Sequence, residues 1–99
     1  MAVYAYVLLT VNSGSERKVC EKISEYDEVL EVKEIYGEYD IAIRVRAEDL
    51  SQLDDLITYK IRSNPNVLLT HTMIIAREHK RVKELGSIRK NEFAQENLR

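Results

Sequence analysis

Apolar and polar positions alternate along the first part of the chain. Every second residue from Val3 to Val11 is apolar, and this period of two over nine residues predicts a β-strand. Residues 12–15 interrupt the alternation. Ser13 and Glu16 have the three-residue spacing of a capping box, which predicts that a helix starts here. Its apolar residues follow at steps of three and four: Val19, Cys20, Ile23 and Tyr26.

The rest of the chain continues the same kind of pattern. Strand-like runs cover residues 29–36 and 39–46, with a turn at Gly37 between them. Glu48 and Asp49 precede a second helix, whose apolar residues end before Pro65. A last strand covers residues 67–76. The second helical stripe consists of Leu50, Leu53, Leu56, Ile57 and Ile61.

The order βαββαβ predicts an α+β, ferredoxin-like fold. In this fold two helices cover one face of a four-stranded antiparallel sheet, with the first and third strands in the middle. The other face is predicted to be partly apolar, because Tyr4, Tyr6 and Leu8 alternate with the valines of the first strand, and the last strand is apolar on both sides. A large apolar face is costly on a monomer, so we expect at least a homodimer.

Composition limits the class of protein. The chain has 99 residues, 44% hydrophobic and 32% charged, and a net charge of −2, which fits one soluble domain without a chain-wide nucleic-acid surface. We expect residues 1–76 to form that domain and residues 77–99, with net charge +3, to form a basic helical tail. The single cysteine, Cys20, excludes an internal disulfide. No stretch resembles a signal peptide or membrane span, so we expect a cytoplasmic protein.

Residues typical of enzymes are scarce. His71 and His79 have no metal-ligand partner at a suitable spacing, and there is no phosphate-binding glycine loop or nucleophile elbow. We therefore predict no enzyme activity, no catalytic residue, no metal and no cofactor. RNA binding by the sheet is also disfavoured, since residues 1–76 are acidic overall and the third strand has no ring beyond Tyr39.

The turn Gly37-Glu38-Tyr39-Asp40 carries the most specific chemistry. Gly37 supplies a turn position, and Asp40 places a carboxylate near the end of a strand. Thr70 and Thr72 lie two residues apart and share one face of the last strand. A carboxylate binds an ammonium group, whereas hydroxyls and backbone N–H groups bind a carboxylate, so this set suits a free amino acid. The alternative is that Asp40 only caps the turn through nearby backbone N–H groups.

Residues 3–76 resemble the RAM domain, the amino-acid-sensing module of the Lrp/AsnC transcription regulators. The resemblance rests on the βαββαβ order and on three motifs: GEYD at 37–40, NPNV at 64–67 and THT at 70–72. It implies homodimers with face-to-face sheets, larger rings such as octamers, and amino acid effectors bound in clefts between dimers. Gly37, Tyr39 and Asp40 would form the turn side of the site, and Thr70 and Thr72 the strand side.

The family's regulators carry a helix-turn-helix domain before the RAM domain, whereas here the first predicted strand follows Met1 directly. We therefore expect a stand-alone sensor or modulator of transcription without specific DNA binding of its own, able to co-assemble with full-length regulators. A second hypothesis is an assembly protein that joins such regulators and has no working ligand pocket. A third is a small dimeric α+β-barrel enzyme, which would need a polar pocket between sheet and helices that the apolar stripes do not provide.

Overall fold

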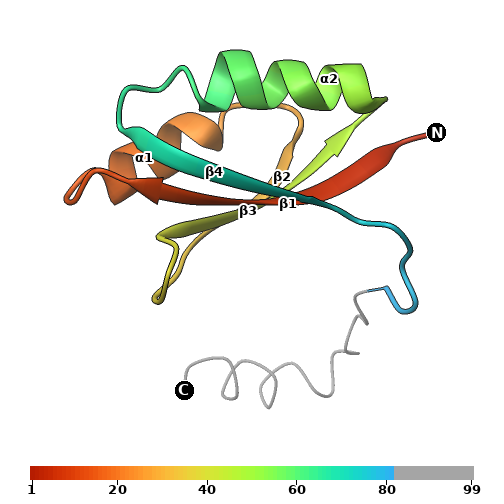
Figure 1. The fold of residues 1–99 in the computed structure, drawn as a ribbon, viewed down its shortest axis with the longest axis horizontal. Helices are drawn as coiled ribbons and strands as arrows, with labels where there is room; N and C mark the ends of the chain where they lie inside the picture. Colours follow the sequence, from red (N-terminus) through yellow and green to blue (C-terminus); the bar gives the residue numbers. More distant parts are fainter. Residues whose placement is uncertain (82–99) are drawn as a thin grey trace, which may run out of the picture.

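The computed structural model describes residues 1–81, which form a sheet and two helical segments (Figure 1). The elements, in order, are β1 (Val3–Val11), α1 (Glu16–Ile23), β2 (Val29–Glu34), β3 (Ile41–Ala47), α2 (Leu50–Asp55), the π-helical segment η1 (Leu56–Ile61) and β4 (Val67–Ile74). The four strands form one sheet in the order β2-β3-β1-β4, and all neighbours are antiparallel. This confirms the predicted ferredoxin-like architecture with β1 and β3 in the middle.

Alternation along the two central strands builds the core. The helical segments lie on one side of the sheet (Figure 1). The β1 and β3 residues on that side are paired across the strands, as in Val7 with Ile43 and Ala5 with Val45. They pack with apolar residues of the helices, so the predicted stripes do face the sheet. The helical residues in the core are Val19, Ile23, Leu53, Leu56 and Ile61.

The helix ends differ from the prediction in two places. The capping box is wrong, because the N-cap of α1 is Ser15 and the Glu16 carboxylate instead accepts a hydrogen bond from Gly14 N–H at 3.0 Å. The second helix widens after Asp55 into the π-helical segment, where Arg62 N–H donates to Ile57 O five residues earlier. Leu50, predicted in the apolar stripe, is 60% exposed at the start of α2.

Strand ends were also predicted too long. β2 ends at Glu34 rather than at residue 36, β3 begins at Ile41 rather than at residue 39, and β4 ends at Ile74 rather than at residue 76. Of the predicted tail helix, residues 77–81 are described and are not helical, and residues 82–99 lie outside the described part.

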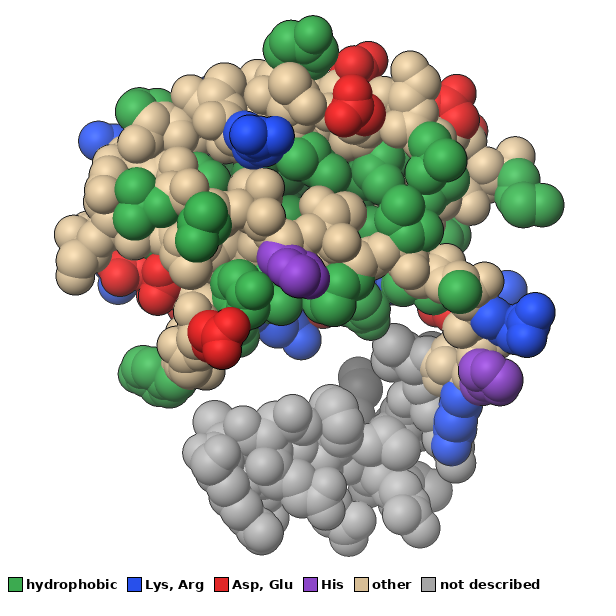
Figure 2. Space-filling view, viewed as in Figure 1, with side chains coloured by type: hydrophobic (Ala, Val, Ile, Leu, Met, Phe, Trp, Pro, Cys, Tyr) green, Lys and Arg blue, Asp and Glu red, His purple; other side chains and the backbone are tan. Residues whose placement is uncertain are grey.

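The face of the sheet opposite the helices is called the open face below. It carries Tyr4, Tyr6 and Leu8 of β1, and the β4 residues that pair beside them in register, such as Met73 beside Tyr6 and His71 beside Leu8. Tyr6, Leu69 and Met73 are all large, apolar and substantially exposed. Hydrophobic side chains also gather over β4 in Figure 2. The predicted two-sided apolar character of the sheet is therefore present.

Candidate functional site

The loop between β2 and β3 is a tight turn that depends on Gly37. Ile35 N–H donates to Asp40 O at 2.9 Å and closes the loop. Gly37 has φ +128°, a conformation that residues with a side chain rarely adopt. A β-carbon at this position would meet no atom within 4 Å, so the backbone angle requires glycine and the available space does not. The predicted turn role of Gly37 is confirmed.

Asp40 ties this turn to the end of the central strand β1. Its backbone N–H donates to Leu9 O at 2.8 Å, and its Oδ2 accepts a half-buried hydrogen bond from Val11 N–H at 2.9 Å. The carboxylate therefore does bond a backbone N–H group, as the alternative for Asp40 supposed. The partner, however, belongs to another strand, 29 residues away in sequence, and not to the turn itself. One carboxylate oxygen is held by this bond, which fixes the direction of the other.

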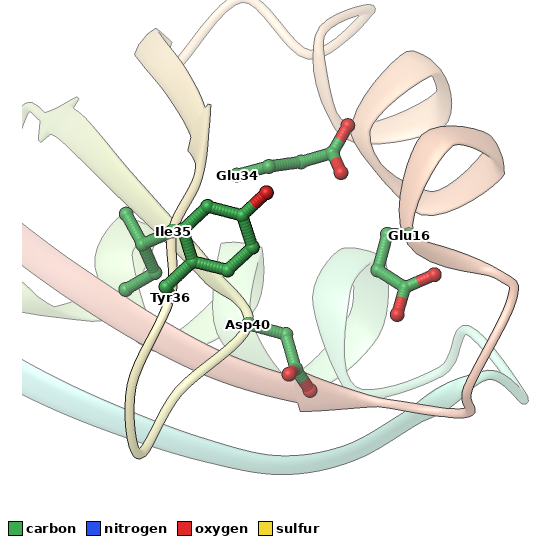
Figure 3. Close-up of a pocket in the computed structure, with 5 residues that line it drawn as sticks. All are labelled: Glu16, Glu34, Ile35, Tyr36 and Asp40. Carbon is green, nitrogen blue, oxygen red and sulfur yellow. The ribbon is translucent and has the colours of Figure 1, made fainter. Parts of the chain in front are cut away.

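A cavity of about 250 Å³ opens beside Asp40. It lies between the start of α1 and the end of β2 (Figure 3). The lining residues are Glu16, Glu34, Ile35, Tyr36 and Asp40. The side chain of Ile35 points away from the other four. Three of the five carry carboxylates and none carries a positive charge, so the cavity favours a cationic group such as an ammonium ion.

The negative potential of this cavity reaches the neighbouring helix. Cys20 lies half-buried on α1. Burial raises the pKa of its thiol above the ordinary value, and the carboxylates of Glu34 and Glu16 raise that pKa further. Two of the cavity's acidic groups thus already disfavour one more negative charge nearby, as they would disfavour the carboxylate of a ligand.

The other predicted site residues lie outside this cavity in the single subunit. Tyr39 packs against His71 of β4, with ring centroids 6.0 Å apart and planes tilted by 58°. Thr70 and Thr72 pair with Leu9 and Val7 and share the helix side of the sheet; both are half-buried. The structure therefore keeps Gly37 and Asp40 in one turn but does not bring Tyr39 and the two threonines into the same cavity, and their role in binding stays a prediction.

The sequence analysis missed four of the five cavity residues, which are Glu16, Glu34, Ile35 and Tyr36. Glu16 had been assigned to a capping box, and the other three to a longer strand. Their shared position depends on how α1 packs against β2, which no local pattern states.

Among residues 1–81, no group of three or more His, Cys, Asp or Glu side chains could hold a metal ion. None of the helices in this range is long and apolar enough to span a membrane.

Comparison with protein families gives a match over most of the chain. The family model described as Lrp/AsnC ligand binding domain matches residues 4–85. The HTH-type transcriptional regulator FL11 of Pyrococcus abyssi is 33% identical over 84 residues, which are 85% of this chain and 55% of that protein. FL11 of Pyrococcus horikoshii gives the same identity and coverage. This chain thus spans about half the length of the curated relatives it matches.

Two solved structures are matched over nearly their whole length by most of this chain. FFRP-DM1 is 42% identical, with a TM-score of 0.72 over 74% of this chain and 97% of that one. The hypothetical protein PHS023 from Pyrococcus horikoshii is 40% identical, with a TM-score of 0.72 over 83% of this chain and 99% of that one. The regulator NMB0573 of Neisseria meningitidis, solved as a complex with L-methionine, is 16% identical with a TM-score of 0.77 over 84% of this chain and 55% of that one. At that identity the likeness concerns the fold alone.

Proposed function

This chain belongs to the Lrp/AsnC ligand-binding domain family, and we propose that it is an amino-acid-binding module that modulates transcription through its assembly with other subunits. The observation that carries the proposal is the position of Asp40. Its carboxylate is fixed by Val11 N–H at 2.9 Å and lines a cavity whose charged groups are all negative. Membership in a family of ligand-binding domains and the presence of a cavity next to the GEYD turn both support a ligand site at Asp40.

The ammonium group of the effector would bind to Asp40. The Val11 hydrogen bond uses Oδ2 and leaves Oδ1 to accept from a ligand. Glu16 and Glu34 add negative charge around the same hollow, which strengthens the attraction for a cation in a partly buried place. Tyr36 would provide an aromatic wall.

The effector's carboxylate would be held elsewhere, because three carboxylates repel it from the floor of this cavity. We assign it to backbone N–H groups and to the hydroxyls of Thr70 and Thr72, with Tyr39 as a wall. In one subunit these residues lie outside the cavity lining. The proposal therefore requires a second subunit to bring the two halves of the site together, which agrees with the clefts between dimers that the family resemblance implies.

The cavity size fits a small effector. Pockets for drug-sized ligands usually measure about 300–1,000 Å³, and about 250 Å³ suits a single amino acid better than a nucleotide or a peptide. A protein of the same fold is known as a complex with L-methionine, and this supports free amino acids as the class without identifying which one this chain binds.

Assembly would use the open face of the sheet. Tyr6, Leu69 and Met73 expose apolar surface there, and face-to-face packing of two sheets would remove it from water at about 25 cal/mol for each Å² buried. The same exposed surface also favours a second candidate function, in which the chain only assembles with larger regulators of its family and its cavity binds no effector.

A thermal-shift screen of the twenty amino acids separates the two functions. An effector that binds only the folded protein, present at ten times its dissociation constant, adds about 1.4 kcal/mol. For a domain of this size that raises the melting temperature by about 6–11 °C. The assembly-only function predicts no shift with any amino acid. A matched screen of Glu38→Gln, which removes an exposed charge from the same turn, should reproduce the wild-type shifts.

A further inference from the structure

Three segments meet at Asn12, which directly follows β1. Its N–H donates to Asn66 O at 2.9 Å, and its carbonyl accepts from Ser15 N–H at 3.0 Å. Its side-chain Nδ2 donates to Asn66 Oδ1 at 3.2 Å. Asn12 therefore joins the end of β1 to the start of α1 and to the turn before β4, at one end of the sheet (Figure 1).

The residues on both sides of Asn12 belong to the candidate site, although Asn12 itself does not line the cavity. Val11, just before it, donates its N–H to Asp40 Oδ2 at 2.9 Å. Glu16, the first residue of α1, lines the cavity together with Asp40. The backbone at residue 12 thus sets both the direction of Val11 N–H and the place where α1 begins.

The ladder of the sheet does not hold this strand end by itself. The β1–β4 register shifts between Thr10 and Val11, so that Leu68 of β4 has no partner on β1. The registered pairs of β1 with β3 also end before Val11. The two hydrogen bonds between Asn12 and Asn66 lie directly beyond this interruption and hold the strand end against the turn before β4.

The NPNV motif presents the partner of Asn12. Asn64 Oδ1 accepts from Asn66 N–H at 2.9 Å, and Asn64 O accepts from Val67 N–H at 3.0 Å, so the first residue of the motif closes the turn. This leaves Asn66 O and Oδ1 to accept from Asn12. The motif thus supplies two acceptors, on one half-buried residue, for the end of β1.

We propose that Asn12 is a positioning residue for the effector site. Its side-chain bond to Asn66 keeps the Val11 peptide oriented so that Val11 N–H stays bonded to Asp40 Oδ2, and Asp40 Oδ1 stays directed at the effector's ammonium group. The inference rests on the proposed function, because it concerns the same carboxylate. Loss of the side-chain bond leaves the core intact and lets the Asp40 carboxylate turn away from the cavity for part of the time.

The expected effect is moderate, because the side-chain bond between Asn12 and Asn66 is exposed. The net free energy of such a bond corresponds to a change of about 2- to 10-fold in an equilibrium constant. The apparent dissociation constant of a ligand rises as the inverse of the fraction of the protein that is competent to bind. Loss of the bond should therefore weaken effector binding by about 2- to 10-fold.

The test uses the full chain with variants of both asparagines. Asn12→Ala removes the side-chain donor and Asn66→Ala removes its acceptor, while either variant keeps the backbone groups that join the two residues. A double variant carries both changes. Asn66→Asp keeps an acceptor for the Asn12 amide and is the conservative rescue. Ser13→Ala truncates an exposed side chain of the same loop and is the matched control.

Two measurements separate positioning from a general loss of stability. The probes for binding are the twenty amino acids, and the one with the largest thermal shift on wild type is titrated into every variant by calorimetry. Amide hydrogen exchange without added amino acid compares Val11 N–H with the other amides of β1. A fold that is merely destabilised exposes these amides together, whereas a local release exposes Val11 alone.

We expect the dissociation constant to rise about 2- to 10-fold in Asn12→Ala and in Asn66→Ala. It should rise no further in the double variant, because both substitutions remove the same bond. Asn66→Asp and Ser13→Ala should bind like wild type. Val11 N–H should exchange faster in both alanine variants, while the other β1 amides keep their wild-type rates.

Unchanged affinity in Asn12→Ala, additive losses in the double variant, or faster exchange along the whole of β1 would overturn the positioning role. If no amino acid binds to wild type, the proposed function fails and the effector role of Asn12 fails with it. The exchange rate of Val11 N–H then still decides whether Asn12 orders the bond between Val11 and Asp40.

Discussion

Asp40 is assigned two roles, and two substitutions separate them. Through Oδ2 it accepts from Val11 N–H at 2.9 Å, which is a structural role, and through its charge it would bind the effector's ammonium group. Asp40→Ala removes both the acceptor and the charge. Asp40→Asn removes only the charge, because the amide oxygen can still accept from the same N–H group.

The two substitutions should lower the stability of the fold by different amounts. In Asp40→Ala the half-buried Val11 N–H at the end of β1 loses its partner, which costs about 1–3 kcal/mol and lowers the melting temperature by about 4–24 °C for a domain of this size. In Asp40→Asn a charged hydrogen bond becomes a neutral one, and the expected cost is about 1 kcal/mol or less. Urea unfolding of the two variants and of wild type measures both values.

For effector binding, the loss of charge alone should have a large effect. Asp40→Asn should weaken the effector found in the screen by about 1.5–3 kcal/mol, the range for a hydrogen bond to a charged group. This is about a 10- to 150-fold rise in the dissociation constant. Isothermal calorimetry measures it, with Glu38→Gln as the control for loss of an exposed carboxylate in the same turn. Equal affinities for wild type and Asp40→Asn would refute the effector role and leave Asp40 as a structural cap.

Three further predictions concern other parts of the chain. Burial raises the pKa of the Glu28 carboxyl, but a backbone hydrogen bond and Lys60 at 3.0 Å lower this pKa by more, so the net shift is downward. The stability that this pair contributes should be present above about pH 4.5 and be lost as the pH falls below it. Glu28→Gln should therefore flatten that part of a plot of melting temperature against pH. Cys20, whose thiol pKa is raised by burial and by Glu34 and Glu16, should react with iodoacetamide at pH 8 more slowly than a free cysteine does, and Glu34→Gln should speed the reaction. Duplex DNA should bind only weakly and without sequence preference, with a steep loss between 50 and 200 mM salt in a fluorescence-anisotropy titration, whereas sequence-specific binding at physiological salt would contradict the prediction.

The strands could be predicted because burial acts on alternate residues. Ala5 and Val7 are fully buried and Tyr6 between them is not, so a period of two is present in the sequence itself. The order of strands followed from the number and type of elements and from the right-handed crossover rule. These constraints are local or topological, and both are visible without coordinates.

The second helix shows what periodicity does not report. Leu56 and Ile61 are five residues apart and both fully buried, because the helix widens to i→i+5 bonding between them. A regular helix of 3.6 residues per turn places Leu50 on the same apolar face as Leu53 and Leu56. In the structure, however, Leu50 lies at the exposed start of α2. The choice between these geometries depends on packing against the sheet, which is a tertiary effect.

The candidate site could be predicted only in part for a similar reason. The glycine and the aspartate of the turn are adjacent in sequence, and their motif indicated them directly. The partner of Asp40 is Val11 N–H, which depends on the β1–β3 register, and the acidic wall of the cavity depends on α1 and β2 lying together. The sequence analysis assigned Glu16 to a capping box, whereas its carboxylate accepts from Gly14 N–H and lines the cavity.

The central claim is that an amino acid binds beside Asp40 at the end of β1. A titration of the ¹⁵N-labelled chain with the amino acid that gives the largest thermal shift tests it most directly, because each backbone N–H group reports its own surroundings. If the amino acid binds beside Asp40, the amides of Gly37, Asp40 and Val11 shift most, and the Val11 shift disappears in Asp40→Asn. Saturable shifts confined to another part of the sheet, or no shift with any of the twenty amino acids, would contradict it.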